Sequence, residues 1–327
     1  MPRDRVAVVG AGVSGLTAAY VLQREHDVTL FEAEAEARLG GHAHTHDLGA
    51  VSVDSGFIVH NEATYPHLVR LFGELGVTTQ DSEMSMSVRD ESTGLEYAGA
   101  RGAEGLFAQK RNLASPRHLG MLAEVLRFHR AARRVLAEGD LDEGVTLGEF
   151  LRRHRFSRHF VDTFAVPVVS AVWSSGAELS MRYPARYLFA FLANHGMLSV
   201  GGSHQWKTVT GGSARYVERV VKGLSAVEVS TPVRAVVRDG EGFEVRDDAD
   251  VAHRFDRVVV ATHAPTALSL LAAPTVPERE LLGAFSYSHN ETWLHTDTSS
   301  CRGRPERGPR GTCCACRART GCSSATT

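Results

Sequence analysis

The stretch that decides the fold is residues 6–15, Val6-Ala-Val-Val-Gly10-Ala11-Gly12-Val-Ser14-Gly15. Its first four residues are apolar, as in a strand buried inside a parallel sheet. Glycines at the spacing G-x-G-x-x-G follow at once, and an Ala- and Leu-rich stretch then runs to about Arg24, before a second apolar run at Val28–Phe31. A strand, a glycine turn, a helix and a second strand within about 30 residues predict an α/β fold with a Rossmann-like opening.

The glycine turn predicts a site for a dinucleotide. Gly10 permits a tight turn, Gly12 lets a pyrophosphate approach the backbone, and Gly15 lets the helix pack closely on the strand. The exposed amides and the positive dipole end at the start of the helix then meet the phosphates, with Ala11 and Ser14 in the same turn. The alternative is a glycine turn in an ordinary α/β fold, and it is disfavoured because strand and helix stand where the motif needs them.

The acidic residue Glu32 completes this motif. It follows the second apolar run directly, 20 residues after Gly12. An acid at that place accepts hydrogen bonds from the ribose hydroxyls of adenosine, and its negative charge repels a 2′-phosphate. We therefore predict an adenine dinucleotide and expect NADP to be disfavoured.

Two later segments separate FAD from NAD. They are Gly40-Gly41-His42-Ala-His44-Thr45 and Asp54-Ser-Gly56-Phe57-Ile-Val59, which an NAD domain does not require. With them the chain resembles the FAD-dependent amine oxidase superfamily, which also holds protoporphyrinogen oxidases and phytoene desaturases. The resemblance covers about residues 5–298. It extends through Asn61–Pro66, Phe107–Asn112, Gln205–Thr208, Gly211–Ser213 and Val258–His263.

The resemblance implies FAD as the cofactor and a flavin-dependent oxidation or desaturation of a C–H or C–N bond. Besides the glycine turn and Glu32, the residues that it assigns to the cofactor are Gly40, Gly41, His42, Gly56, Phe57, Val233 and Thr262. Members of the superfamily often have Arg where this chain has His42. The sequence identifies no catalytic residue, which suits a reaction whose chemistry the cofactor supplies.

The length of 327 residues suggests two lobes. We expect a discontinuous, Rossmann-like FAD-binding domain over residues 1–90 and 203–298. A mainly helical substrate domain over residues 91–202 is inserted into it, and Thr146-Leu-Gly-Glu149 predicts a capping box at one of its helices.

The basic and aromatic residues of the helical region each have two interpretations, and these bear on the substrate. This region carries seven basic residues among leucines, either as a solvated face or as a surface for an anionic membrane. These are Lys110, Arg111, Arg117, Arg127, Arg130, Arg133 and Arg134. It also carries aromatic residues that belong either to the core or to an apolar pocket, namely Trp173, Tyr183, Tyr187, Phe189, Phe191 and Trp206. We expect a small-molecule substrate of apolar or lipid-like character, with peripheral membrane contact as an open alternative.

Composition limits the other function classes. A formal charge of −2 disfavours a globally basic nucleic-acid binder. We find no apolar run of 18 residues and no signal peptide, so we expect a cytoplasmic protein. The sequence does not indicate an oligomeric state.

Two clusters of polar residues have structural and functional interpretations. His42, His44 and His46 alternate, yet no carboxylate or thiolate is spaced to complete a coordination sphere, so we expect no metal. Asp54 is either catalytic or an anchor that accepts hydrogen bonds from backbone amides. We favour the anchor.

The last 27 residues differ from the rest. They hold all five cysteines and six Arg against one Glu, so residues 1–300 carry a formal charge of −7. The chain has 33 Arg and 3 Lys, as expected of a GC-rich gene, and a shifted reading frame of such a gene yields Arg, Gly, Cys, Ser, Thr and Pro. We expect residues 299–327 to be a disordered frameshift tail in place of the C-terminal cofactor segment. The alternative function is therefore a truncated, catalytically inactive fragment that binds FAD or another adenine dinucleotide.

Overall fold

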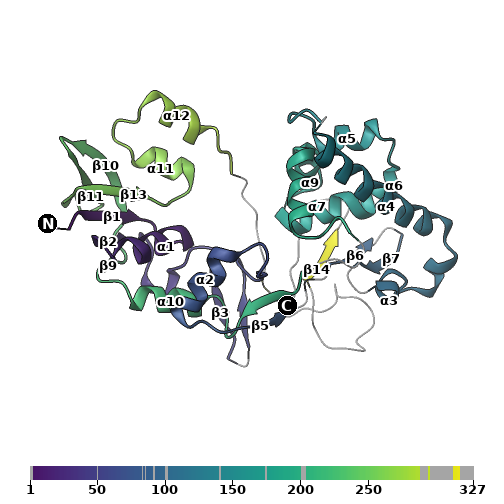
Figure 1. Ribbon diagram of the computed structural model, residues 1–327, viewed down its shortest axis with the longest axis horizontal. Helices are drawn as coiled ribbons and strands as arrows, with labels where there is room; N and C mark the ends of the chain where they lie inside the picture. Colours follow the sequence, from purple (N-terminus) through teal and green to yellow (C-terminus); the bar gives the residue numbers. More distant parts are fainter. Residues whose placement is uncertain are drawn as a thin grey trace. The chain divides into compact units, whose positions relative to one another are not determined.

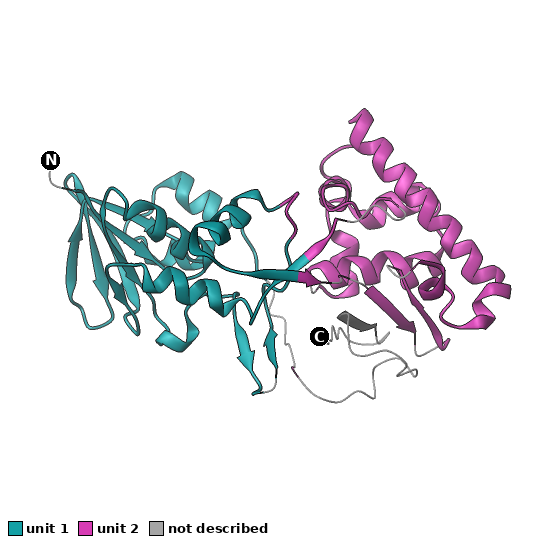
Figure 2. Cartoon of the chain, turned by 60° about the horizontal axis from the view of Figure 1, so that its bottom comes forward, with its two compact units in different colours: residues 1–60, 65–80, 207–289 teal, residues 61–64, 81–206, 290–327 magenta. Residues whose placement is uncertain are grey.

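The chain divides into two compact units (Figure 2). The computed structural model describes residues 3–49, 51–82, 84, 86–90, 93–99, 102–139, 141–173, 175–199, 204–287 and 294, and the backbone of 312–316. Unit 1 comprises residues 1–60, 65–80 and 207–289, and unit 2 comprises residues 61–64, 81–206 and 290–327. Residues 81–90, expected in the FAD-binding domain, lie in unit 2 because β6 (Met86–Asp90) pairs there with β7 (Leu95–Ala98).

Unit 1 is built on a parallel four-stranded sheet with the order β13-β1-β2-β9 (Figure 1). The strands are β1 (Arg5–Val9), β2 (Asp27–Phe31), β9 (Val227–Glu228) and β13 (Arg257–Val260). Helix α1 (Val13–Leu22) connects β1 to β2, so the predicted βαβ opening and α/β class are confirmed. Because β1 has neighbours on both edges, its apolar residues are buried, and Ala7 and Val8 are 0% exposed.

Further elements complete unit 1. A meander with the order β10-β11-β12 packs Val245 and Phe255 against Ala7 and Phe31 of the parallel sheet. The remaining elements are η1 (Glu36–Arg38), β3 (Thr45–Asp47), β4 (Ser52–Asp54), α2 (Pro66–Leu75), α10 (Ala214–Lys222), β10 (Val233–Asp239), β11 (Gly242–Asp247), β12 (Ala252–Phe255), α11 (Ala264–Leu270) and α12 (Val276–Gly283). Two of the boundaries between the units fall within β5 (Thr79–Ser82) and β8 (Trp206–Val209).

Unit 2 is mainly helical. Its helices are α3 (Gly102–Leu106), η2 (Lys110–Ala114), α4 (Pro116–Glu138), α5 (Leu147–Arg153), α6 (Arg158–Phe160), the π-helix η3 (Val161–Ala165), α7 (Val166–Trp173), α8 (Ala177–Arg182) and α9 (Ala185–Asn194). Phe128 of α4 is at the centre of the core, with its ring centroid 5.7 Å from that of Phe160 and 5.5 Å from that of Phe189. Edge-to-face and tilted aromatic pairs at these distances add to the energy of apolar burial.

The aromatic residues of the helical region mostly belong to this core or are otherwise buried. Phe189 is 0% and Trp206 6% exposed. Trp173, Tyr183 and Phe191 pack against the core as partly buried residues. Tyr187 differs because it is 60% exposed. The core interpretation is therefore confirmed for Trp173, Tyr183, Phe189 and Phe191.

The capping box predicted at Thr146 is only half formed. The Thr146 side chain accepts a hydrogen bond from the Glu149 amide at 3.3 Å, as an N-cap should. The Glu149 carboxylate, however, accepts from Arg153 at 3.1 Å, one helical turn further on. The i,i+4 ion pair has taken the acid away from the second half of the box.

The C-terminal tail lies largely outside the described residues. Within it, Thr312–Cys316 form strand β14, which pairs in parallel with β6. The edge of β6 offers backbone partners that a composition argument does not foresee. The expectation of a disordered tail otherwise falls outside the described residues and stays a prediction. In the described part of the chain, no helix is both long and apolar enough to cross a membrane.

Candidate dinucleotide site

The glycine turn of unit 1 shows why each glycine is needed. Gly10 adopts a φ of +100°, which favours glycine, and a Cβ added to Gly15 would stand 1.8 Å from the Gly10 carbonyl oxygen. Gly12 differs, because an added Cβ would meet nothing within 4 Å among the described residues. Protein packing therefore explains Gly10 and Gly15, whereas no described residue fills the space beside Gly12.

Gly12 is also the N-cap of α1. It offers no side chain to the amides of the first turn, and the first turn contains no acidic residue. The N–H groups that begin the helix therefore remain as donors, at the positive end of the helix dipole. Ser14 lies exposed in this first turn. This end of α1 has the features of a phosphate site.

Glu32 lies against the turn. Its Oε2 accepts a hydrogen bond from the Ala11 amide at 2.6 Å, and its Oε1 accepts from the Glu34 amide at 3.1 Å. The backbone of Glu32 is held on both sides, because its amide donates to Glu228 at 2.8 Å and its carbonyl accepts from Thr231 at 2.8 Å. These two contacts come from β9 and from Thr231 just after it, far along the chain, so the glycine motif does not predict them.

The double glycine returns to the same turn. The Gly40 amide donates to the Ala11 carbonyl at 2.9 Å, and a Cβ added to Gly41 would stand 3.2 Å from the Gly12 Cα. Both glycines have positive φ, 103° and 60°. The structure thus brings Gly40 and Gly41 directly beside Gly12.

The second family-like segment holds this loop from the other side. The Phe57 amide donates to the His42 carbonyl at 2.9 Å, and a Cβ added to Gly56 would stand 2.0 Å from the same oxygen. The exposed His42 ring lies with its centroid 5.7 Å from that of His263. His42, Gly56 and Phe57 therefore form one unit with the double-glycine loop.

The last two predicted residues, Thr262 and Val233, lie in separate segments of unit 1. Thr262 follows β13, and its Cγ2 would stand 3.2 Å from a Cβ added to Gly10, so it lines the glycine turn. Val233 begins β10 beside a bulge between Val233 and Ala235, and it packs partly buried near Phe31 at the end of β2. Thr262 thus lies beside the glycine turn, and Val233 packs near the end of β2, just before Glu32.

Asp54 is an anchor in this structure. Its carboxylate accepts from the Ser213 amide at 2.9 and 3.1 Å and from the Ser213 hydroxyl at 2.9 Å. It also accepts from the Thr45 hydroxyl at 2.5 Å, and Thr45 Oγ1 in turn accepts from the Ala214 amide at the start of α10. The preferred interpretation of Asp54 is confirmed.

The alternating histidines contact one another and polar neighbours. The ring centroids of His44 and His46 lie 4.4 Å apart, and His46 Nε2 lies 3.0 Å from the Ser55 hydroxyl. Burial lowers the pKa of His44, and the nearby Arg38 lowers it further. Among the described residues, no group of three His, Cys, Asp or Glu side chains is placed to hold a metal ion.

A glycine turn that opens a helix after β1, with an acid after β2, defines a dinucleotide-binding α/β protein. The model of the family described as "Flavin containing amine oxidoreductase" matches residues 13–292. The chain belongs to this family. The match confirms the resemblance that the motifs indicate. It also confirms a flavin as the cofactor, because proteins of this family contain one.

Individual relatives agree with this assignment. The Mycobacterium tuberculosis protein named "Putative flavin-containing monoamine oxidase AofH" is 29% identical over 290 residues, which is 85% of this chain and 61% of that protein. Protoporphyrinogen oxidase 2 of Arabidopsis thaliana is 28% identical over 64% of this chain and 41% of its own length. The cyclohexylamine oxidase of Brevibacterium oxydans shares the fold, with a TM-score of 0.65 at 19% identity over 86% of this chain and 63% of that chain.

Proposed function

We propose that this protein is a flavin-dependent oxidoreductase that holds FAD at the glycine turn of unit 1. The observation that carries the proposal is the combination at Gly12 of open space, an uncapped helix start and the adjoining Glu32 carboxylate. Phosphates would lie at the α1 amides and the adenosine ribose at Glu32. The chain spans 61% of the length of the mycobacterial relative, so activity and substrate are both part of the proposal.

The Glu32 carboxylate retains capacity for a ribose. Each of its oxygens accepts one backbone hydrogen bond, from Ala11 or Glu34. A carboxylate oxygen has two acceptor positions, so each can accept one further hydroxyl. The two backbone bonds orient the carboxylate before the ligand arrives, which lowers the cost of binding.

When bound, FAD would supply the acceptor for a hydride equivalent from a C–H or C–N bond. The protein residues argued above would then bind and orient it. We further propose Gly40, Gly41, His42 and Thr262 as neighbours of the cofactor, because the structure gathers them around the turn, and Val233 as its adenine contact by the family resemblance.

We propose an apolar or lipid-like small-molecule substrate. On α4, Leu119 and Leu126 are 44% and 49% exposed among basic residues, a pattern suited to an anionic membrane surface. Arg127, however, pairs with Glu124 at 3.1 Å, as on a solvated face. Flotation with anionic liposomes at low salt decides between a membrane surface and a solvated face. Protein that stays entirely in the soluble fraction argues against the membrane surface.

The test of the cofactor site is FAD affinity. Glu32→Ala should weaken binding by about 10- to 100-fold, as expected for loss of hydrogen bonds to a charged group. Gly12→Val should abolish it, because the side chain fills the space at the turn. Glu34→Ala is the matched control, since it removes an exposed acid two residues away and leaves the amide that bonds Glu32. Unchanged affinity in both Glu32→Ala and Gly12→Val would contradict the site.

Turnover is tested separately. Purified protein should show flavin absorbance bands, and these should bleach under anaerobic conditions with an oxidisable substrate from a panel of amines and apolar compounds. Flavin that stays oxidised throughout would instead favour the second function, binding of the dinucleotide without turnover.

A further inference from the structure

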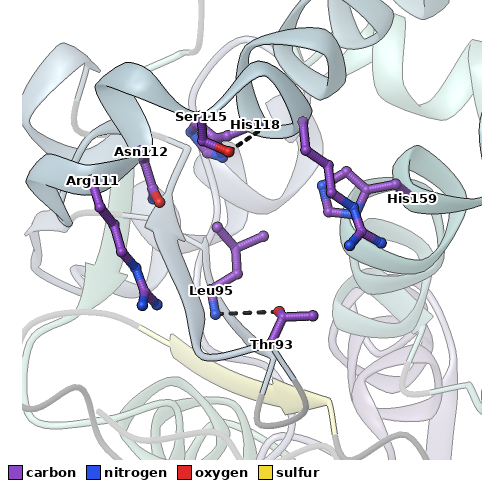
Figure 3. Close-up of a pocket in the computed structure, with 8 residues that line it drawn as sticks. Thr93, Leu95, Arg111, Asn112, Ser115, His118 and His159 are labelled. Carbon is purple, nitrogen blue, oxygen red and sulfur yellow. Dashed lines mark hydrogen bonds between the residues drawn. The ribbon is translucent and has the colours of Figure 1, made fainter.

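A cavity of about 180 Å³ lies in unit 2, lined by residues of β7, η2, α6 and the start of α4. In Figure 3, Arg111 and His159 stand on opposite sides of it, with Leu95 between them. The lining includes two guanidinium groups, those of Arg111 and Arg117, and two imidazoles, those of His118 and His159, and no carboxylate is among the described residues that line it. We propose that this cavity binds a phosphate group.

Arg111 is already oriented by the protein. Its Nη2 donates to the Gly94 carbonyl, and its Nε donates to Gln109 Oε1 at 3.3 Å. Among the described residues, its other N–H groups have no partner. A planar guanidinium that is fixed in advance loses little freedom when it binds an oxyanion.

Arg117 and His159 complete the donors of the cavity. In the part of the chain that the structure describes, neither the Arg117 guanidinium nor the His159 imidazole has a hydrogen bond or an ion pair. Arg127 of the same helix, by contrast, pairs with Glu124 at 3.1 Å. Two potential cations therefore line the cavity, and no acid among the described residues is bonded to either.

The charges around the cavity repel one another. Burial lowers the pKa of His159 most, and then Arg117 and His118 lower it further. Asp90 and Asp162 act in the opposite direction, with smaller effects. Helix α4 adds its positive end, because its first turn contains no acidic residue. An anion among these groups would relieve the repulsion and favour the protonated imidazole.

The backbone that carries His159 is held firmly. Immediately after α6 the helix widens into the π-helix Val161–Ala165, and Thr163 Oγ1 donates to the His159 carbonyl at 2.6 Å. The Tyr97 hydroxyl donates to the Thr163 carbonyl, also at 2.6 Å. π-helical turns are frequent at functional sites. This one positions His159 at the cavity.

Size and donor number select the ligand. Pockets for whole small molecules measure about 300–1,000 Å³, so this cavity suits a single oxyanion or a headgroup. Two guanidinium groups and an imidazole carry more N–H donors than the four acceptor positions of a carboxylate can take. A phosphate offers three or four oxygens and nearly two negative charges.

The phosphate has two potential sources, a free phosphate or a phospholipid headgroup. Leu113 of η2 and Leu119 of α4 are 58% and 44% exposed, on two of the four elements that line the cavity. They would contact acyl chains if the source is a lipid.

The primary experiment is a calorimetric titration of the full chain with inorganic phosphate at constant ionic strength. Arg117→Ala should weaken saturable binding by about tenfold or more, as for a charged hydrogen bond. The matched control Arg130→Ala removes an exposed arginine of the same helix that does not line the cavity, and should change affinity by less than about twofold. Gly12→Val should retain this binding, which separates the cavity from the glycine turn of unit 1.

The second arm identifies the source. Phosphatidylcholine vesicles with and without phosphatidic acid are tested, with free phosphate as competitor. Vesicle binding that needs phosphatidic acid, is lost in Arg117→Ala and is displaced by phosphate supports the cavity with a lipid as the source. Saturable binding of free phosphate alone supports it with a soluble ligand. The proposal is overturned if neither form binds saturably, or if Arg130→Ala loses as much affinity as Arg117→Ala.

Discussion

Two glycines of unit 1 stand against backbone atoms, whereas two glycines of unit 2 stand in open space among the described residues. In unit 1 an added Cβ would stand 1.8 Å from a backbone oxygen at Gly15 and 2.0 Å at Gly56. In unit 2, at Gly120 and Gly176, it would meet nothing within 4 Å among the described residues. Unit 1 is therefore held around its site by backbone segments in direct contact, whereas the core of unit 2 is made by side chains that surround Phe128.

The histidines show the same division. Burial lowers the pKa of several histidines of unit 2, which are His118, His129, His154, His159 and His195. In unit 1, burial lowers the pKa of His44. A unit that buries neutral imidazoles loses stability in acid, because the unfolded chain binds protons that the folded chain excludes. We therefore expect unit 1 to be sensitive to added volume at Gly15 and Gly56, and unit 2 to be sensitive to pH.

The largest effect should come from Gly15→Ala. The new Cβ meets the Gly10 carbonyl, and a backbone atom cannot move aside as a flexible side chain can. We expect a loss of about 3 kcal/mol or more in the free energy of unfolding of unit 1, together with loss of FAD binding. Hydrogen exchange of peptides from β1 and α1 measures the loss locally.

Gly73→Ala is the matched control for this substitution. Gly73 also lies in a helix of unit 1, α2, but its added Cβ meets nothing within 4 Å among the described residues. Alanine there should stabilise by about 0.5–1 kcal/mol, because it lowers the entropy cost of the helix. Equal destabilisation by both variants would show that close backbone contact does not distinguish Gly15.

The second effect is the pH dependence of unit 2. Burial lowers the pKa of His129 from 6.5 to about 4. Between these values the unfolded chain binds the extra proton, so stability is full above about pH 6.5 and falls by about 3 kcal/mol towards pH 4. The two tryptophans that the structure describes, Trp173 and Trp206, lie in unit 2, so their fluorescence in urea titrations at several pH values reports this loss.

Substitution of His129 by Leu isolates its share. The variant should have a shallower pH dependence over the same range, with the remainder due to the other buried histidines of unit 2. His67→Leu, at an exposed position on α2 of unit 1, is the control and should leave the tryptophan-detected curve unchanged. An unchanged slope in His129→Leu would refute the assignment of the acid sensitivity to this imidazole.

The sequence predicts features that depend on neighbouring residues, but not contacts between residues far apart in the chain. Gly10, Gly12 and Gly15 predict the turn because the requirement for glycine is local, and the structure gathers Gly40 and Gly41 beside them. The bonds of Glu32 to Glu228 and Thr231 join positions about 200 residues apart, which no local pattern reveals. The charged cavity at Arg117 depends likewise on how β7, η2 and α6 converge.

The third effect concerns the anchor at Asp54. Asp54→Ala leaves the Ser213 amide and the Ser213 and Thr45 hydroxyls without their acceptor. We expect a cost of about 2 kcal/mol to unit 1, the usual penalty for partly buried donors left unsatisfied. Exchange of the α10 amides should rise first. Asp47→Ala is the control, because it removes one exposed bond to Gly49 in the same hairpin. If Asp54→Ala abolishes turnover while α10 stays protected, the residue acts in catalysis instead.

The smallest effect compares helix caps across the units. At α12 of unit 1 the Thr275 hydroxyl accepts from the Glu278 amide, and Glu278 Oε2 accepts from the Thr275 amide at 2.7 Å, so the box is complete. Thr275→Ala should cost about 1 kcal/mol, and Thr146→Ala, where only half a box exists, about half of that.

The cap of α12 should also depend on pH. The Thr275 backbone bond lowers the pKa of Glu278 below its usual value, so this carboxylate stabilises the cap above that range and loses the effect as the pH falls through it. Protection of the α12 amides should therefore fall in the wild type as the pH drops through this range. Thr275→Ala should be less protected than the wild type at every pH, because the hydroxyl that it lacks accepts from the Glu278 amide whether or not the carboxylate is charged. Thr275→Ser keeps the hydroxyl and should retain the wild-type protection. Loss of protection in Thr275→Ser as large as in Thr275→Ala would mean that packing of the threonine methyl, rather than the box, holds the start of α12.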